Sequence, residues 1–203
     1  MWLAPAFHHF GPKRATEDGA YTITAQGIAS NSIRRNPGAT IFLPSEDEWY
    51  KAAYYSAISE RYFEYPASTD AQITCETPGA AANTANCGTV IGDLTAVGSY
   101  TGSASPSGTL DQGGNVQEWN ERIVSDFSRG LRGGEFRNFP LGLSALHPND
   151  NVHMSFEHEG IGFRLASLIP EPHTALLVMA GLVGMAGWRR RRVMFIAGKE
   201  FER

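Results

Sequence analysis

The sequence Ser-Gly-Thr-Leu-Asp-Gln-Gly-Gly-Asn-Val-Gln-Glu-Trp-Asn, at residues 107–120, contains the turn that decides the fold. Two consecutive glycines, Gly113 and Gly114, permit backbone angles that other residues rarely adopt, so the chain can bend sharply between Asp111 and Glu118. Oxygen-rich side chains around such a turn are the ligands that a hard cation such as Ca²⁺ prefers. The spacing is not that of an EF-hand, and an ordinary turn held by side-chain hydrogen bonds is the alternative.

Four motifs, in order along the chain, resemble the formylglycine-generating enzyme family, also called the sulfatase-modifying factor domain. Gly-Asn-Val-Gln-Glu-Trp at 114–119 is similar to the family signature Gly-Asn-Val-Trp-Glu-Trp. The segments 42–49 (Phe-Leu-Pro-Ser-Glu-Asp-Glu-Trp), 130–136 (Gly-Leu-Arg-Gly-Gly-Glu-Phe) and 160–166 (Gly-Ile-Gly-Phe-Arg-Leu-Ala) resemble three further family motifs. The resemblance covers residues 15–167, and it implies an α+β, C-type-lectin-like fold with few regular elements and many loops.

The resemblance also implies a calcium site at the central turn. Asp111 and Glu118 would provide side-chain oxygens, and Gly114 and Val116 would provide backbone carbonyls. Residues two apart in an extended segment point to the same side, so we expect the intervening residues to face away from the ion and Trp119 to pack into the core.

Catalytic members of the family hold a second calcium ion in a loop-rich region, which corresponds here to residues 65–107. Asn83 or Asn86 together with Asp93 are the counterparts that the resemblance indicates, with a looser alignment than at the first site. Long irregular segments in compact domains usually bind something or are fixed by a metal or a disulfide. In an exported protein, Cys75 and Cys87 can form such a disulfide, and no spacing around them is typical of a zinc site.

The chemistry of the family separates two functional hypotheses. Its catalytic members bind copper through two cysteines that follow the Gly-Gly motif, because thiolates suit cuprous copper. Here no cysteine follows Gly133-Gly134, which predicts no copper site and no catalytic residues. The leading hypothesis is a non-catalytic binding module for a surface protein or an extracellular polysaccharide. The alternatives are an enzyme of the family with altered chemistry and an unrelated enzyme.

Local patterns predict the regular elements. Ser45, with Glu48 three residues later, forms a capping box, so we expect a helix from Glu46 to about Ile58 with Trp49 on its buried face. Strands are expected at residues 21–25, 40–43, 97–100, 130–136 and 160–167.

Several polar residues in the last third of the sequence are predicted to form an ion pair or a solvated surface, not a metal site. Arg164, in the last expected strand, is predicted to pair with a buried carboxylate. The remaining histidines and glutamates there suggest a metal site by type, but their spacings favour a solvated surface: His147, His153, Glu157, His158 and Glu159.

Charge is distributed unevenly along the 203 residues, whose formal net charge is −4. Residues 189–203 contain six Arg or Lys and two Glu, a net +4, so the remainder carries −8. An acidic main part argues against nucleic-acid binding. With 42% apolar residues, 22 Gly and 11 Pro, the sequence is consistent with one globular domain that is not dominated by helices.

The C-terminal region resembles the PEP-CTERM sorting signal of Gram-negative bacteria. Pro170-Glu171-Pro172 is followed by an apolar segment, 174–188, and by the arginine cluster Arg189, Arg190, Arg191 and Arg192. The apolar segment is short for a hydrocarbon core of ~30 Å, and a buried helix or a short tail anchor is the alternative. The resemblance implies transient anchoring in the inner membrane, recognition by an exosortase and release to the cell surface or an exopolysaccharide matrix.

Four regions follow from these patterns. Residues 1–14 form a poorly defined N-terminal segment without the apolar run of a signal peptide, and residues 15–167 form a domain that we expect to be incomplete at its N-terminal side. Residues 168–192 form the sorting signal, and 193–203 extend beyond the point where such signals usually end.

Overall fold

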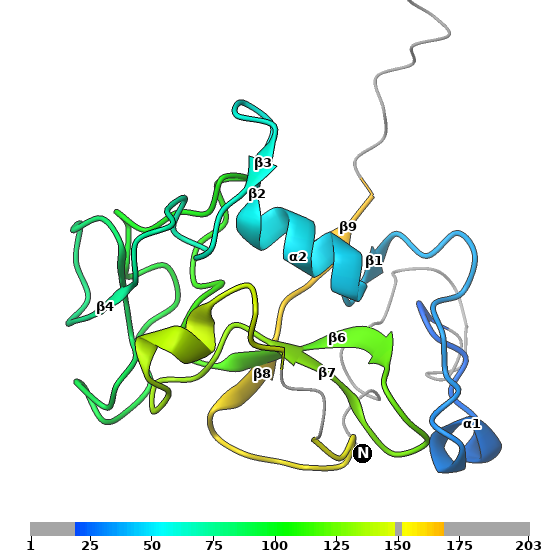
Figure 1. Cartoon of the computed structure of the whole chain (residues 1–203). Helices are drawn as coiled ribbons and strands as arrows, with labels where there is room; N and C mark the ends of the chain where they lie inside the picture. Colours follow the sequence, from blue (N-terminus) through cyan, green and yellow to red (C-terminus); the bar gives the residue numbers. More distant parts are fainter. Residues whose placement is uncertain (1–18, 149–151, 169–203) are drawn as a thin grey trace, which may run out of the picture. The chain divides into compact units, whose positions relative to one another are not determined.

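The computed structural model describes residues 19–148 and 152–168, and the chain divides into two units, Met1–Ser167 and Leu168–Arg203. The described part of the first unit mixes short strands and short helices, which agrees with the predicted α+β class (Figure 1). In chain order the elements are α1 (Ala25–Ala29), β1 (Ile41–Phe42), α2 (Glu46–Tyr54), β2 (Tyr55–Ser56), β3 (Arg61–Tyr62), β4 (Thr74–Cys75), β5 (Thr84–Ala85), β6 (Gln117–Ile123), β7 (Arg129–Arg132), the 3₁₀ helix η1 (Pro140–Leu143), β8 (Ile161–Phe163) and β9 (Ala166–Ser167).

The largest sheet in the described residues has β6 at its centre. β7 pairs with β6 in antiparallel orientation and β8 pairs with it in parallel orientation, so Glu118 lies opposite both Arg132 and Gly162. The glycine turn leads directly into this central strand. Residues that follow the turn are therefore positioned by hydrogen-bonded neighbours on both sides.

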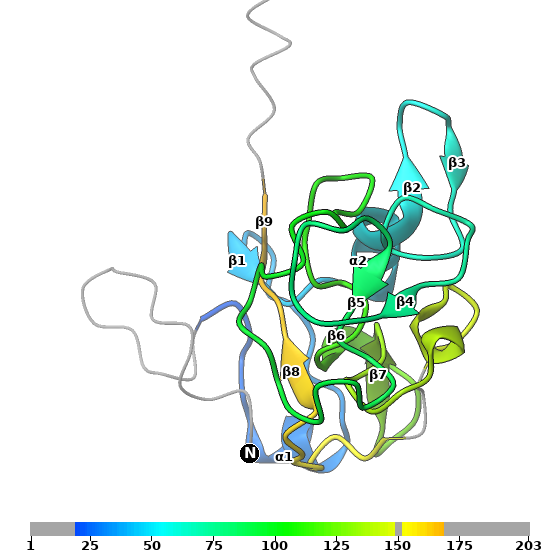
Figure 2. The same cartoon turned by 90° about the vertical axis from the view of Figure 1, so that its left-hand side faces the viewer.

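Helix α2 lies beside this sheet, as Figures 1 and 2 both show. The predicted capping box is confirmed: the Ser45 side chain accepts from the Glu48 amide, and the Glu48 carboxylate accepts from the Ser45 amide. Such a box satisfies two amide groups that have no partner inside the helix. Trp49, Ala53 and Tyr54 are fully buried, which confirms the predicted inward face at Trp49 and Ala53.

The helix ends at Tyr54, four residues before the predicted end at Ile58. The chain instead continues into β2, which pairs with β3 so that Tyr55 lies opposite Tyr62. The connecting turn is held by the Ser56 hydroxyl, which accepts from the Ser59 amide at 3.2 Å. Aromatic cross-strand pairing and burial of Tyr54 favour the hairpin over one more helical turn.

Two expected strands are replaced by isolated bridges. At 21–25, Tyr21 and Thr22 are bridge residues, with Tyr21 opposite Arg35, and the chain then enters α1, which Thr24 caps by accepting from the Gly27 amide at 3.0 Å. At 97–100, only Tyr100 makes a bridge, to Gly79.

The expected strands 40–43, 130–136 and 160–167 are present in shorter form. β7 ends before Gly133 and Gly134, whose φ angles of 94° and 70° are closed to an extended strand. Arg164 and Leu165 separate β8 from β9, and β9 then pairs with β1, with Phe42 opposite Ala166. This pairing places residues 41–42, just before α2, beside residues 166–167 at the end of the first unit.

The segment between β3 and β6 has few regular elements, as predicted. A disulfide joins Cys75 at the end of β4 to Cys87 just after β5, with the two Cα atoms 4.8 Å apart. β4 and β5 are parallel, and Cys87 is fully buried with Tyr65, Ile73, Ala85 and Leu143. A covalent bond therefore stabilises a region where backbone pairing is sparse.

Candidate functional site

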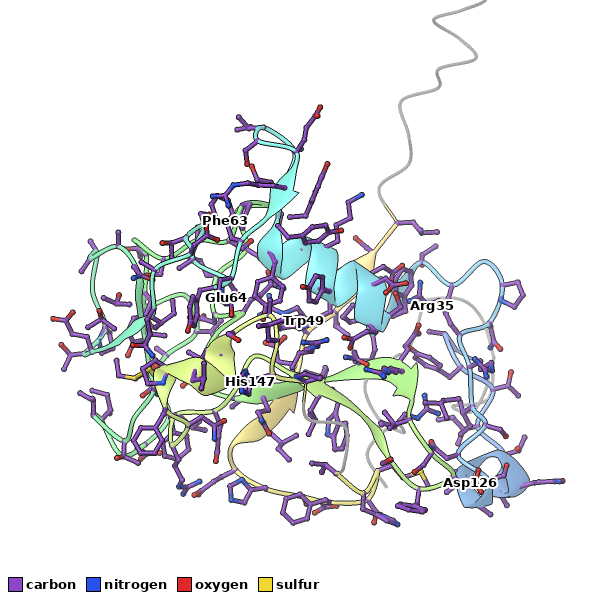
Figure 3. The ribbon with its side chains drawn as sticks, viewed as in Figure 1. Arg35, Trp49, Phe63, Glu64, Asp126 and His147 are labelled. Carbon is purple, nitrogen blue, oxygen red and sulfur yellow. A yellow bond between two sulfur atoms is a disulfide. The ribbon has the colours of Figure 1, made fainter. Side chains whose placement is uncertain are left out.

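Glu118, the acidic residue of the central motif, has a carboxylate that is held by two donors. Arg164 donates from Nε to Oε2 at 2.5 Å and from Nη2 to Oε1 at 2.7 Å, and the Trp49 indole donates to Oε2 at 2.7 Å (Figure 3 labels Trp49). The Glu118 residue is only 5% exposed. The prediction that Arg164 pairs with a buried carboxylate is confirmed, and such a bidentate pair fixes the position of its partner.

Arg164 also connects Glu118 to the turn. Its Nη2 donates to the carbonyl oxygens of Asp111 at 3.0 Å and Leu110 at 3.3 Å. The Asp111 carboxylate accepts from the Gly98 amide at 2.5 Å. The guanidinium of Arg164 thus connects the Glu118 carboxylate to the backbone carbonyl of Asp111, while the Asp111 carboxylate bonds Gly98, so the predicted meeting of the two carboxylates stays a prediction.

The backbone of the turn explains why simple alternation fails here. Asp111, Gly114 and Asn115 have φ angles of 56°, 78° and 65°, all in the left-handed region. A side chain at Gly114 is excluded by space as well, since a Cβ there would lie 2.4 Å from the Asn86 carbonyl oxygen. The turn can therefore approach the loop around Asn86 closely.

One predicted orientation in this stretch is wrong, that of Trp119, whereas the prediction that Asn115 faces away from a bound ion stays a prediction. Asn115 is 8% exposed and binds the loop at Thr95. Trp119 is only partly buried, because the interior face of β6 is occupied by the polar residues Glu118 and Asn120. The left-handed turn at Asn115 shifts which residues of the following strand face inward.

The second predicted site is centred on Asn86. Its Nδ2 donates to the Asp93 carbonyl oxygen at 2.9 Å and to the Asn115 Oδ1 at 3.0 Å, and Asn115 Oδ1 also accepts from the Thr95 amide at 2.9 Å. Asn86 is 1% exposed, yet within the part of the chain that the structure describes its buried Oδ1 has no hydrogen-bond partner. An unpaired buried oxygen is costly, so this atom is the candidate ligand atom of the predicted second site.

Asn83 does not join this group. It precedes β5 whereas Asn86 follows it, and its Nδ2 donates to the Gln72 carbonyl oxygen at 2.8 Å. Its Oδ1 is also buried and unpaired among the described residues. Asn86 and Asp93 are therefore the members of the predicted set that the structure brings together, although the Asp93 side chain is exposed.

A second ion pair beneath α2 was not predicted from the sequence. Arg132 of β7 donates from Nε to the Glu46 carboxylate at 2.7 Å, and Asn120 of β6 donates to the same carboxylate at 2.6 Å. Arg132 is 7% exposed. Glu46 lies in the first turn of α2, where a carboxylate is favoured, but nothing local indicates its partner.

Arg35 forms a third charged group with two glutamates. It donates to Glu121 at 2.6 Å and to Glu48 at 2.7 Å, while the Tyr21 hydroxyl donates to Glu121 at 2.6 Å (Figure 3 labels Arg35). The hydrogen bonds from Arg35 lower the pKa of Glu48 to about 2. Burial, with the bond to Glu121, raises the pKa of Tyr21 above its ordinary value. This group ties the first described residues to β6 and α2.

The predicted surface role of the late histidines and glutamates is confirmed. All five of these residues are exposed: His147, His153, Glu157, His158 and Glu159. Within the described residues, no three or more His, Cys, Asp or Glu side chains gather in a way that could hold a metal ion. A calcium site would therefore depend on amide and carbonyl oxygens as well as carboxylates.

Residues 168–192 match the family model of the PEP-CTERM protein-sorting motif, which confirms that part of the sequence analysis. The motif implies recognition by an exosortase and processing to a secreted or surface form. The apolar segment 174–188 and the four arginines lie outside the described residues, as do 1–14 and 193–203. None of the helices in 19–148 or 152–168 has the length and apolar character needed to cross a membrane.

No curated protein matches the chain. Solved structures similar to it include CarF (26% identity, TM-score 0.49, covering 68% of this chain and 51% of CarF). Treponema denticola variable protein 1 has 20% identity and a TM-score of 0.49, covering 71% and 53%. PvdO from Pseudomonas aeruginosa has 20% identity and a TM-score of 0.46, covering 64% and 53%. The chain thus spans about half the length of each of these proteins.

Proposed function

We propose that the protein is an exported, calcium-stabilised and non-catalytic binding module that acts at the cell surface or in an exopolysaccharide matrix. The match of residues 168–192 to the sorting motif carries the proposal of export. The disulfide between Cys75 and Cys87 supports it, because disulfides persist mainly in oxidising compartments. The four sequence motifs support a relationship to the formylglycine-generating enzyme family.

Processing of the tail tests the proposed export. In a host with a matching exosortase, mass spectrometry of extracellular protein should find a chain that ends near Pro172. A variant with Arg189–Arg192 replaced by Asn should remain unprocessed, because it lacks the basic flank that orients the segment. Extracellular protein that retains residues 173–203 would contradict the proposal.

Calcium binding is proposed first at the Asn86 loop. Ca²⁺ takes six to eight oxygen ligands, and Asn86 offers an unpaired buried oxygen beside Asp93. At the central turn, by contrast, Arg164 already supplies positive charge to Glu118 and to the Asp111 carbonyl. Calcium at Asp111, Gly114, Val116 and Glu118 stays a prediction, and there the ion would compete with Arg164.

The non-catalytic assignment rests on the cysteines. The sequence contains two, and both form the Cys75–Cys87 disulfide, so neither provides a thiolate for copper. Incubation with copper and a cysteine-containing sulfatase peptide should yield no aldehyde. Turnover above a copper-only control would favour the alternative, an enzyme of the family with altered chemistry.

A further inference from the structure

The disulfide adjoins the candidate calcium ligand Asn86. Asn86 lies between the last residue of β5 and Cys87, which is bonded to Cys75 at the end of β4 (Figure 3 draws the bond in yellow). On the other side of Cys87, a Cβ at Gly88 would lie 3.1 Å from the Cys75 sulfur. The covalent bond therefore holds the chain within one residue of Asn86.

Hydrogen bonds support the same stretch of backbone more weakly. β4 and β5 are joined over two residue pairs. The Asn86 carbonyl oxygen accepts from the Asn115 amide at 2.9 Å, and the Gly88 amide donates to the Asn138 carbonyl oxygen at 2.8 Å. Each such bond contributes modestly, because water replaces it when it breaks, whereas a disulfide limits the separation of its two ends covalently. The disulfide is therefore the strongest single restraint on the position of Asn86.

The position of Asn86 matters because its amide group is already oriented. Its Nδ2 donates to the Asp93 carbonyl oxygen and to Asn115 Oδ1, while its Oδ1 is buried and unpaired within the described residues. The affinity of a calcium site depends on the charge of its oxygen ligands and on how rigidly they are held. An oxygen that is fixed before the ion arrives costs less free energy to order on binding. A restraint on Asn86 should thus strengthen calcium binding.

We propose that the Cys75–Cys87 disulfide controls calcium binding at the Asn86 loop, so that the site reaches its full affinity only in the oxidised protein. This regulation rests on the proposed calcium site and on the proposed export. The reducing interior of the cell keeps thiols reduced, and disulfides persist outside it. Export would therefore switch the loop from a weak calcium site to a strong one.

The switch is a balanced two-electron reaction. As the bond between the two sulfurs forms, two S–H bonds break, and two electrons and two protons pass to a disulfide oxidant, which becomes a dithiol. Cys75 is partly exposed, whereas Cys87 is fully buried. A dithiol reductant can therefore attack the Cys75 sulfur, and the Cys87 sulfur leaves and takes up a proton.

Calcium binding and reduction of the disulfide must influence each other equally. If closing the bond strengthens calcium binding by some factor, then bound calcium makes the bond harder to reduce by the same factor. A factor of roughly ten lies within the usual range for coupled sites, and for this two-electron couple it corresponds to about 30 mV.

Isothermal titration calorimetry of the chain 1–203 with calcium chloride tests the proposal. We expect the dissociation constant to rise roughly tenfold when dithiothreitol reduces the bond, and the variant with Cys75→Ser and Cys87→Ser to match the reduced parent. Asp93→Asn should bind weakly in both redox states. Arg132→Met is the matched control for lost stability alone: it removes an ion pair beneath α2, outside the loop region, and should keep the affinity of the oxidised parent.

Circular dichroism establishes that each form is folded during the titration, with sucrose added where reduction unfolds the chain. Equilibration in dithiothreitol buffers, with calcium or with a chelator, measures the reciprocal effect on the disulfide. Equal calcium affinity of the folded oxidised and reduced forms would overturn the proposed control while leaving the calcium site intact. Protection of the disulfide by calcium that persists in Asp93→Asn would also overturn it. No calcium binding in either form would refute the calcium site itself.

Discussion

The region around α2 and the three-stranded sheet differs from the loop region between β3 and β6 in how its polar groups are satisfied. Beneath α2, the buried carboxylate of Glu118 is paired with Arg164, and the partly buried carboxylate of Glu46 is paired with Arg132. In the loop region, the amide oxygens of Asn83 and Asn86 are buried without a partner among the described residues, and a disulfide provides the strongest connection.

The difference shows that the two regions of this chain are stabilised in different ways: one by ion pairs, the other by a disulfide. Beneath α2, Glu46, Glu118 and Arg132 are placed by helix or strand, and Arg164 lies in the short link between β8 and β9, so each charged pair is held between ordered elements. The loop region has little secondary structure to place such pairs, so it depends on a covalent bond and, as we propose, on an ion. The first region should therefore respond mainly to substitution of charge, and the second to reduction and chelation.

The largest expected effect comes from Arg164→Met. It leaves the Glu118 carboxylate buried without its cationic partner, which should cost about 3–5 kcal/mol in the free energy of unfolding. Arg61→Met is the control, because the Arg61–Asp70 pair is half-exposed and screened by water, so its loss should lower the free energy of unfolding far less. Equal costs in urea denaturation would show that burial does not distinguish the two pairs.

Replacement of both cysteines by serine should cost about 3 kcal/mol, since the bond closes a short loop of the unfolded chain. Hydrogen exchange should accelerate in residues 74–87 more than in α2. The parent protein with reductant provides the matched comparison. Uniform acceleration across both regions would mean that they do not differ in the proposed way.

Calcium should raise the midpoint of thermal unfolding. At a free calcium concentration one hundred times the dissociation constant, binding should add up to about 2.7 kcal/mol to the free energy of unfolding. Asp93→Asn should remove most of this response, whereas Asp126→Asn, an exposed change elsewhere that Figure 3 labels, should not. Glu118→Gln separates the two sites: loss of response in that variant alone would place the ion at the central turn. A parent midpoint unaffected by calcium or chelator would refute both sites.

The smallest effect is expected for Glu48→Gln. Glutamine preserves the capping box but removes the charge that pairs with Arg35. The folded pKa of about 2 is below the ordinary value of 4.5, so this pair stabilises the fold above pH 4.5 and its contribution is lost as the pH falls toward 2. The side chain is 43% exposed, so we expect a cost of only about 1 kcal/mol at pH 7. A cost that persists unchanged at pH 2 would contradict this interpretation.

Local signals predicted the features that depend on a few neighbouring residues. The capping box at Ser45 and Glu48 and the sharp turn at Gly113–Gly114 follow from the chemistry of adjacent groups. The same reasoning predicted too long a helix α2. Helix periodicity describes neighbours along the chain and therefore did not predict the cross-strand pairing of Tyr55 with Tyr62.

The sequence by itself determined the motif order, the helix start, the sorting motif and the partner type for Arg164. The tertiary structure decided which carboxylate Arg164 binds, that Glu46 pairs with Arg132, that Asn115 faces inward, and that Cys75 meets Cys87. The physical reason is that buried charges and amides are satisfied by groups distant in sequence. The positions of these distant groups depend on the turn at Gly114, which leads the chain into β6 between β7 and β8.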